Sequence, residues 1–143
     1  MRQRLLDTTP LTALRNNRPA IVSLLCPALA CDELATSILA YAEVLEWLKG
    51  GSDFTRRRAQ LRRLLRGVHP YLVTYSILNR YADIRRQLRP PYGLGLIGDI
   101  DTLIAATALT YDLELVTTDG DFLRVPDLRV LLLDRRTFAP IAR

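Results

Sequence analysis

The sequence predicts an α/β protein with a mainly parallel sheet, and three observations support this prediction. Short apolar runs of strand length alternate along the chain with longer runs of helix length. Breaks rich in glycine and proline separate some of these runs, at residues 50–51 and 90–95. Acidic residues lie just after several of the predicted strands, where the loops of a parallel sheet share one edge.

The first strand and helix are predicted on either side of Asp7. Arg4–Asp7 is a short apolar run that ends in an acid. A helix is expected to begin at Pro10, with Thr8 or Thr9 as its cap, because proline is favoured in the first helical turn. Asp7 therefore lies at a strand-to-helix turn, where a role in capping is as consistent with its position as a role in chemistry.

A second helix, a second strand and a third helix are predicted next. The second helix follows Arg18 and is expected to end at Pro27. Leu34–Leu39 is the strand, and Tyr41–Lys49 is a helix that a Gly-Gly pair ends. Glu43 falls in the first turn of that helix, near the sheet edge where the first strand ends. A lone glutamate on a helix is usually solvated, so Glu43 gains meaning only beside other acids.

Residues Phe54–Arg66 are the most basic stretch of the chain. The spacing of Leu61, Leu64 and Leu65 predicts an amphipathic helix with a narrow apolar stripe. The rest of this helix carries six arginines: Arg56, Arg57, Arg58, Arg62, Arg63 and Arg66. Because these like charges repel one another, the helix favours an anionic partner, either nucleic-acid phosphate or an acidic protein segment.

The second half of the chain continues the alternation of strands and helices. An extended segment or strand is predicted at Val68–Val73, and an amphipathic helix at Tyr75–Leu88. Asp99 is placed to cap a further helix that runs to about Tyr111. The predicted remainder is a strand, an acidic loop and a last strand, at residues 114–117, 118–122 and 128–133.

Composition predicts one globular domain with a preference for anions. Hydrophobic residues make up 49% and charged residues 24% of the chain, which is ordinary for a globular protein. No repeat or linker divides the sequence, so residues 1–143 are predicted to form a single domain. Twenty basic residues against 15 acidic ones give a net charge of +5, and Lys49 is the only lysine. Arginine favours bidentate contact with phosphate or carboxylate.

The remaining residue counts exclude several classes of protein. Cys26 and Cys31 are too few for a disulfide framework, and His69 is the only histidine, so a zinc site is not indicated. The two cysteines are expected to be buried thiols in a reducing compartment. The sequence shows no leader peptide and no run of about 18 apolar residues, so we expect a cytoplasmic protein that does not enter the membrane.

Four carboxylates are predicted to share one edge of the sheet. Asp7, Asp101 and Asp119 each lie on a loop after a strand or in the helix turn that follows, and so does Glu43. Four like charges at one edge are costly unless a cation neutralises them, and Mg²⁺ and Mn²⁺ prefer carboxylate and water oxygens. The pattern therefore indicates metal-assisted hydrolysis of a phosphodiester.

The order of these acidic motifs resembles that of PIN-domain ribonucleases, specifically the VapC-type toxins of bacterial toxin–antitoxin pairs. The resemblance covers nearly the whole chain. Leu5–Thr8 is similar to the opening strand motif and Thr36–Glu43 to the second acidic motif. Tyr81–Leu88 with Ile97–Ala108 is similar to the third motif, and Leu115–Phe122 to the fourth. Each motif is weak alone, but four in order at compatible spacing are fairly specific.

The resemblance implies a PIN-like three-layer α/β/α fold, in which helices flank a short, mainly parallel sheet of about four to five strands. It implies that Asp7, Glu43 and Asp101 are the core metal ligands and that Asp119 completes the site. Asp121 is a near neighbour, and whether it or Asp119 is the nearer ligand stays open. It further implies Mg²⁺ or Mn²⁺ as cofactor, RNA as substrate, a cognate antitoxin and a homodimer. The family usually has asparagine where this chain has Thr9, a departure that concerns the local turn more than metal binding.

Two other hypotheses compete with the nuclease. Leu96–Thr102 also resembles the motif of haloacid-dehalogenase-type phosphatases, with Asp99 as nucleophile and Asp101 as acid/base. That nucleophile normally opens its fold, however, and the lysine expected after it is missing, because Lys49 precedes it. The second alternative is a PIN-like domain that binds RNA or protein without cutting. The acidic set argues against it, since a binder of polyanions gains nothing from carboxylates beside the phosphates.

Overall fold

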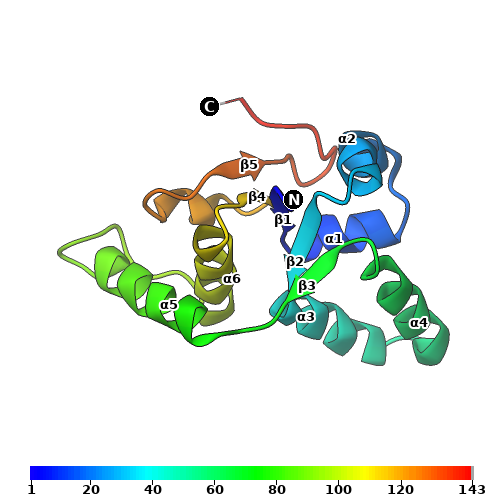
Figure 1. Cartoon of the computed structure of the whole chain (residues 1–143), viewed down its shortest axis with the longest axis horizontal. Coiled ribbons are helices and arrows are strands. Elements are labelled where there is room, and N and C mark those ends of the chain that lie inside the picture. The colour runs from blue at the N-terminus through cyan, green and yellow to red at the C-terminus, as the bar shows by residue number, and fades with distance from the viewer. Residues whose placement is uncertain (143) are drawn as a thin grey trace.

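Five parallel strands form one sheet at the centre of the molecule (Figure 1). The computed structural model describes residues 1–142 of the chain. The strand order is β3-β2-β1-β4-β5, so the predicted parallel sheet of four to five strands is confirmed. The strands are β1 (Arg4–Leu6), β2 (Leu34–Ser37), β3 (His69–Tyr71), β4 (Glu114–Thr117) and β5 (Val130–Leu132).

Helices cover both faces of this sheet and complete the predicted three-layer α/β/α fold. The helices are α1 (Thr8–Arg15), α2 (Pro19–Ala30), α3 (Ile38–Lys49), α4 (Phe54–Leu64), α5 (Tyr75–Leu88) and α6 (Asp99–Thr110), with a short 3₁₀ helix, η1 (Gly120–Arg124). Helices α1 to α4 pack on one face, whereas α5 and α6 pack against each other on the other face. Figure 1 shows α5 and α6 on one side of the sheet and α3 and α4 on the other.

Alternation along the strands gives each helical layer its own core. Leu5 packs in the core that α5 and α6 share, and its neighbour Leu6 packs in the core of α1 to α4. Both side chains are fully buried. The central strand β1 pairs with β2 on one side and β4 on the other, in a register that sets Leu6 beside Thr36 and Val116. The carboxyl ends of these three strands therefore meet at one edge, immediately before Asp7.

Several predicted boundaries differ from those in the structure. The second strand ends at Ser37 rather than at residue 39, because the Ser37 hydroxyl accepts a hydrogen bond from Leu39 N and begins α3 early. Helix α1 begins at Thr8 with Asp7 at its N-cap position, so neither Thr8 nor Thr9 is the cap. Pro27 does not end the second helix, because the turn after it continues and Cys31 N donates to Pro27 O at 3.1 Å.

The structure corrects the expectation that the two cysteines are buried. Cys26 and Cys31 are free, as predicted, but both are exposed rather than buried. The reason is that α2 is an outer helix that buries only Ile21 and Leu25.

Helix α4 lies where the sequence predicts a helix, with Leu61 fully buried, although it ends at Leu64 rather than at Arg66. Among residues 1–142, the structure contains no helix with the length and apolar character needed to cross a membrane.

Candidate active site

Asp7 is the innermost carboxylate at the carboxyl edge of the sheet. It directly follows β1 and is only 8% exposed. Thr117, at the end of the neighbouring strand β4, donates a hydrogen bond from its hydroxyl to Asp7 Oδ2 at 2.8 Å. Burial raises the pKa of Asp7 above its usual value, the Thr117 hydrogen bond opposes this rise, and the nearby charges of Glu43 and Asp119 add to it. Asp7 is thus a fixed carboxylate that a nearby cation would stabilise.

Glu43 reaches the same edge from α3. The sequence predicts Glu43 in the first turn, but because α3 begins at Ile38, Glu43 lies in the second turn. The Thr8 hydroxyl donates to Glu43 Oε1 at 2.6 Å, which links α3 to the first turn of α1. This short hydrogen bond fixes the carboxylate beside the turn that follows β1.

Asp101 lies in the first turn of α6, on the other helical layer. Burial, and after it the negative charges of Asp7, Asp119, Glu43 and Asp121 in that order, together raise the pKa of Asp101 to about 6. Because the charges of four other carboxylates raise the pKa of Asp101, all five carboxylates lie close together. The structure therefore brings the predicted residues into one acidic site, which consists of Asp7, Glu43, Asp101, Asp119 and Asp121.

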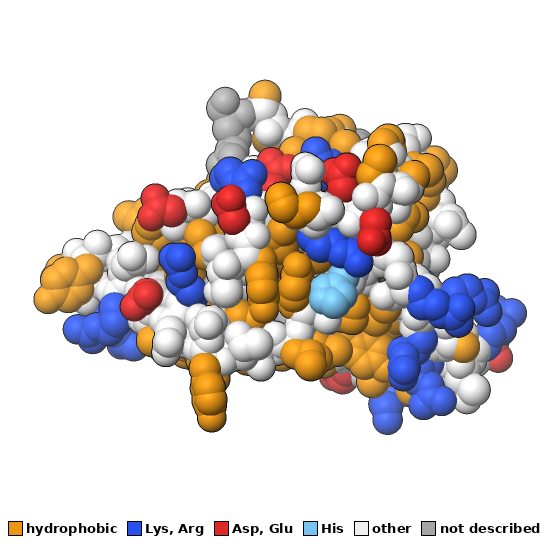
Figure 2. Space-filling view, in the orientation of Figure 1, with side chains coloured by type: hydrophobic (Ala, Val, Ile, Leu, Met, Phe, Trp, Pro, Cys, Tyr) orange, Lys and Arg blue, Asp and Glu red, His pale blue; other side chains and the backbone are white. Residues whose placement is uncertain are grey.

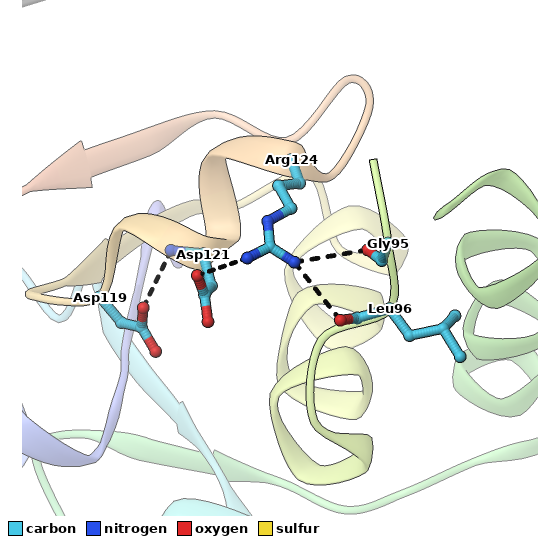
Figure 3. A network of polar contacts seen from close by, with 5 residues as sticks. All are labelled: Gly95, Leu96, Asp119, Asp121 and Arg124. Carbon is cyan, nitrogen blue, oxygen red and sulfur yellow. Dashed lines mark hydrogen bonds and ion pairs between the residues drawn. The ribbon is translucent and has the colours of Figure 1, made fainter. Parts of the chain in front are cut away.

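The loop after β4 carries the last two acids (Figure 3). Asp119 N donates to the Thr117 hydroxyl at 3.0 Å, so the same threonine holds both Asp119 and Asp7. Asp119 Oδ1 in turn accepts a hydrogen bond from Asp121 N at 2.9 Å and caps η1. The predicted acidic loop is therefore an ordered turn, and Thr117 at the end of β4 connects it to Asp7.

Arg124 is a residue of this site that sequence reasoning missed. Its Nη2 pairs with Asp121 Oδ1 at 2.9 Å, and its Nη1 donates to the carbonyl oxygens of Gly95 and Leu96 at 3.5 and 3.4 Å (Figure 3). Gly95 and Leu96 belong to the segment that leads into α6 and Asp101. The only sequence signal was the spacing of three residues between Asp121 and Arg124, which places them on adjacent turns of a short helix.

Comparison with known proteins identifies the fold that carries this site. A sequence model of the PIN domain matches residues 4–128, which is most of the chain. The chain belongs to the PIN domain family. No curated protein sequence gives a significant match.

Solved structures similar to this PIN domain come from several bacteria. VapBC2 from Rickettsia felis, bound to a promoter DNA fragment, contains a chain with 22% identity and a TM-score of 0.80, over 92% of this chain and 98% of that one. VapBC-1 from nontypeable Haemophilus influenzae has a chain with 25% identity and a TM-score of 0.77, over 90% of this chain and 96% of that one. FitAcB from Neisseria gonorrhoeae has a chain with 23% identity and a TM-score of 0.73, over 90% of this chain and 96% of that one. These similarities confirm the fold over nearly the full length of the two chains in each comparison.

Asp99 lies outside the acidic site of this PIN domain. Its carboxylate accepts hydrogen bonds from Tyr81 Oη at 3.0 Å and from Arg85 Nη1 at 2.8 Å, both on α5. The predicted capping role is wrong, because Gly98 occupies the N-cap position of α6 and Asp99 is the first helical residue. The phosphatase hypothesis also needs Asp99 at the end of a strand, whereas here a loop precedes it and its side chain is 70% exposed.

The donor chemistry of the acidic site fits a hard divalent cation. All its side chains offer carboxylate oxygens, and in residues 1–142 Asp121 is the only one of the five that forms an ion pair. In the same residues no three Asp, Glu, His or Cys side chains surround a single point at ligating distances. The five charges are thus close enough to repel one another without forming a closed cage, a state that a cation would relieve.

Proposed function

We propose that this PIN domain is a metal-dependent endoribonuclease and the toxin of a toxin–antitoxin pair. The observation that carries the proposal is the acidic site itself, in which four other carboxylates raise the pKa of Asp101. Similar structures support the biological context, since they include a toxin–antitoxin complex from Klebsiella pneumoniae and VapBC-5 from Mycobacterium tuberculosis. Their names describe those proteins, and the same role for this chain is our inference.

Mg²⁺ or Mn²⁺ is the proposed cofactor. When bound, such a cation polarises a phosphoryl oxygen and lowers the pKa of a water molecule for attack on phosphorus. Asp7, Glu43 and Asp101 are the proposed principal ligands, with Asp119 as the fourth. Asp119 is favoured over Asp121 because Arg124 already pairs with Asp121, while Asp119 shares Thr117 with Asp7.

Residues of this chain orient the site and hold the substrate in this proposal. Thr117 and Thr8 fix the Asp7 and Glu43 carboxylates through hydrogen bonds of 2.8 and 2.6 Å, which lowers the cost of ordering them during the reaction. The arginines of α4 attract the RNA backbone, because four of the five are exposed, Arg57 is half-buried, and none forms an ion pair within residues 1–142.

The test is RNA cleavage by the purified protein. We expect cleavage with Mg²⁺ or Mn²⁺, and its loss with a chelator or with Asp101→Asn. Asp99→Asn is the matched control, since it changes an aspartate two residues away that lies outside the acidic site, and it should stay active. Cleavage that survives both the chelator and Asp101→Asn would refute the mechanism. RNA binding without cleavage under either metal would favour the non-catalytic alternative.

A cognate antitoxin and a homodimer are further parts of the proposal. Their support is the resemblance to VapC-type toxins together with the VapBC structures that share this fold. Co-expression with the product of an adjacent small gene should give a stable complex in which RNA cleavage is suppressed.

The homodimer has a test of its own, because light scattering of the isolated protein should give twice the chain mass of 16.2 kDa. A monomer at all concentrations tested would exclude the homodimer. The proposed location is the cytoplasm, where RNA and the antitoxin are available.

A further inference from the structure

We propose that the cavity beside Glu43 is a nucleobase subsite, in which one unpaired base of the RNA stacks on Trp47. This inference rests on the proposed function and adds to it the part of the substrate that the protein grips. It assigns a binding role to residues of α1 and α3 that lie outside the acidic site.

The cavity adjoins the acidic site and has the size of a small-ligand pocket. Its volume is about 560 Å³, and α1, α3 and the segment after β5 line it. Thr8 and Glu43 form part of its wall, and they are the hydrogen-bonded pair that links α1 to α3 at the acidic site. A ligand in the cavity would therefore touch the same glutamate that is proposed to hold the metal. Pockets of this volume hold molecules as large as a nucleotide.

Trp47 is the aromatic surface of this cavity. It follows Glu43 by four residues on α3, so the two side chains lie on the same face of the helix, one turn apart. The Trp47 side chain is 61% exposed, which is unusual for the largest apolar side chain. An exposed indole beside a phosphodiester site suits a base, because every base presents an aromatic face that stacks without sequence preference.

The opposite wall offers polar groups that suit the edge of a base. Thr9 and Thr12 of α1 and Asn16 at its C-cap line the cavity, at spacings of three and four residues that place them along one side of that helix. None of their side chains forms a hydrogen bond within residues 1–142. Two hydroxyls and an amide supply both donors and acceptors, as the mixed edge of a base requires.

Arginines lie on both sides of Trp47, where the phosphates next to a stacked base would pass. Arg18 and Arg135 line the same cavity, and Arg18 rests over the ring of Phe138 with its guanidinium carbon 5.2 Å from the ring centre. A second hollow, of about 510 Å³, shares Trp47 and contains Arg57 of α4. Two arginine positions separated by an indole match a polynucleotide chain better than they match a protein helix, which needs a continuous apolar groove.

Intrinsic fluorescence tests the proposal directly, because Trp47 is the only tryptophan of the chain. The probes are RNA hexamers of defined sequence, added to the protein in chelator so that nothing is cleaved. We expect saturable quenching of Trp47 by the hexamers. A hexamer of the same length without bases should bind through its phosphates and leave the fluorescence unchanged. Equal quenching by both hexamers would overturn the stacking assignment.

Variants measured with fluorescently labelled RNA give a second readout. Trp47→Ala should weaken RNA binding by about 10-fold, whereas Trp47→Phe should keep most of the affinity, because a phenyl ring still stacks. Tyr75→Ala is the matched control, since Tyr75 is an 88% exposed aromatic residue on α5 that does not line the cavity, and it should bind like the wild type. Unchanged affinity in Trp47→Ala would refute the subsite.

Failure of this inference is distinguishable from failure of the nuclease proposal. Quenching of Trp47 by RNA in a protein that cuts no RNA with either metal would refute the nuclease and leave the subsite in place. Metal-dependent cleavage that is unaffected by Trp47→Ala would refute only the subsite. Quenching by an antitoxin peptide but by none of the RNA hexamers would assign the cavity to a protein partner and overturn the inference.

Discussion

The acidic site and the arginine-rich helix α4 differ in how firmly the fold holds their charges. In the acidic site, Asp7 is 8% exposed, and hydrogen bonds from Thr117 and Thr8 hold Asp7 and Glu43. On α4, five arginines project from a helix whose only fully buried residue is Leu61, and none of them forms an ion pair within residues 1–142. Figure 2 shows the Lys and Arg side chains gathered over α4 at the right of the view.

The two regions therefore need different kinds of ligand. Each is a set of like charges that destabilises itself in isolation. Fixed carboxylates around a small volume match one small cation, which must be placed precisely for chemistry. Arginines spread over a wide surface match a long polyanion, which needs charge but no fixed register. Changes in the acidic site should therefore affect the rate of cleavage, and changes on α4 should affect binding.

The largest expected effect is that of Asp7→Asn. We expect the single-turnover rate of RNA cleavage to fall by about 10³-fold, since the lost charge weakens stabilisation of the transition state by several kcal/mol. RNA affinity should stay equal or rise, because one negative charge near the phosphates is removed. Filter binding in chelator and cleavage with Mn²⁺ measure the two quantities separately. A parallel loss of affinity and rate would remove the distinction between the two regions.

The second prediction concerns Arg124, which both neutralises the charge of Asp121 and holds the segment before α6 through Gly95 and Leu96. In Arg124→Met, Asp121 loses its counter-ion, so Mn²⁺ should bind the RNA-free protein more tightly. The cleavage rate should nevertheless fall by about 10-fold to 100-fold, as for other residues that support metal ligands, since the tie to Gly95 and Leu96 is also lost. Calorimetry with Mn²⁺ and single-turnover cleavage measure the two effects.

Matched variants separate these two roles of Arg124. Arg124→Lys keeps the positive charge without the forked contact, so its Mn²⁺ affinity should match the wild type while its rate falls. Arg129→Met is the control, because it removes an arginine from an exposed ion pair with Asp112 on the opposite edge of the sheet. Weaker rather than tighter Mn²⁺ binding in Arg124→Met would show that Arg124 acts only by positioning Asp121.

The α4 arginines give the third prediction. Replacement of Arg56, Arg57 and Arg58 by glutamine should weaken RNA binding by about 10-fold and lower the slope of log affinity against log salt by about 2. The cleavage rate at saturating RNA should be unchanged, because these residues lie outside the acidic site. The measurement is RNA affinity between low and physiological salt. A lower rate at saturation with an unchanged salt slope would contradict the proposed division of roles.

That these carboxylates lie near one another could be predicted from the sequence, because their positions follow strands. Asp7 directly follows one strand-like run and Asp119 comes two residues after another, and the carboxyl ends of parallel strands meet at one edge whatever the details of packing. The same rule explains the position of Asp101, which lies in the first turn of a helix at that edge. Pattern and topology were sufficient for these positions.

The interactions that set side-chain geometry could not be predicted from local patterns. The role of Thr117 depends on a contact with a residue 110 positions earlier, and that of Thr8 on one 35 positions later. Asp99 looked like a helix cap because aspartate favours that position, yet Tyr81 and Arg85 on α5 compete for its carboxylate. The cavity at Trp47 likewise arises only when α1, α3 and the segment after β5 pack together.

The smallest expected effect concerns stability, and it tests whether the acidic site is strained without metal. Negative charge in the first turn of α6 is favourable to the helix by about 0.5 kcal/mol, but the raised pKa of Asp101 shows that burial and repulsion outweigh this. A carboxyl whose pKa is about 6 in the folded state, above its usual value of 3.8, binds its proton more tightly when folded. The stability contributed by this group therefore falls as pH rises from about 4 to about 6.

Asp101→Asn should remove that loss of stability and thus stabilise the metal-free protein at pH 7. A shift of this size corresponds to about 3 kcal/mol if undamped, and solvent screening at a half-exposed group reduces it to about 1 kcal/mol, or roughly 3 °C in Tm. The advantage should vanish near pH 4, where Asp101 is protonated, and shrink on addition of Mn²⁺, which stabilises only the protein that binds it. A variant less stable than the wild type in chelator at pH 7 would show that Asp101 is held mainly by favourable contacts, and that the acidic site, unlike α4, needs no ligand to offset its charge.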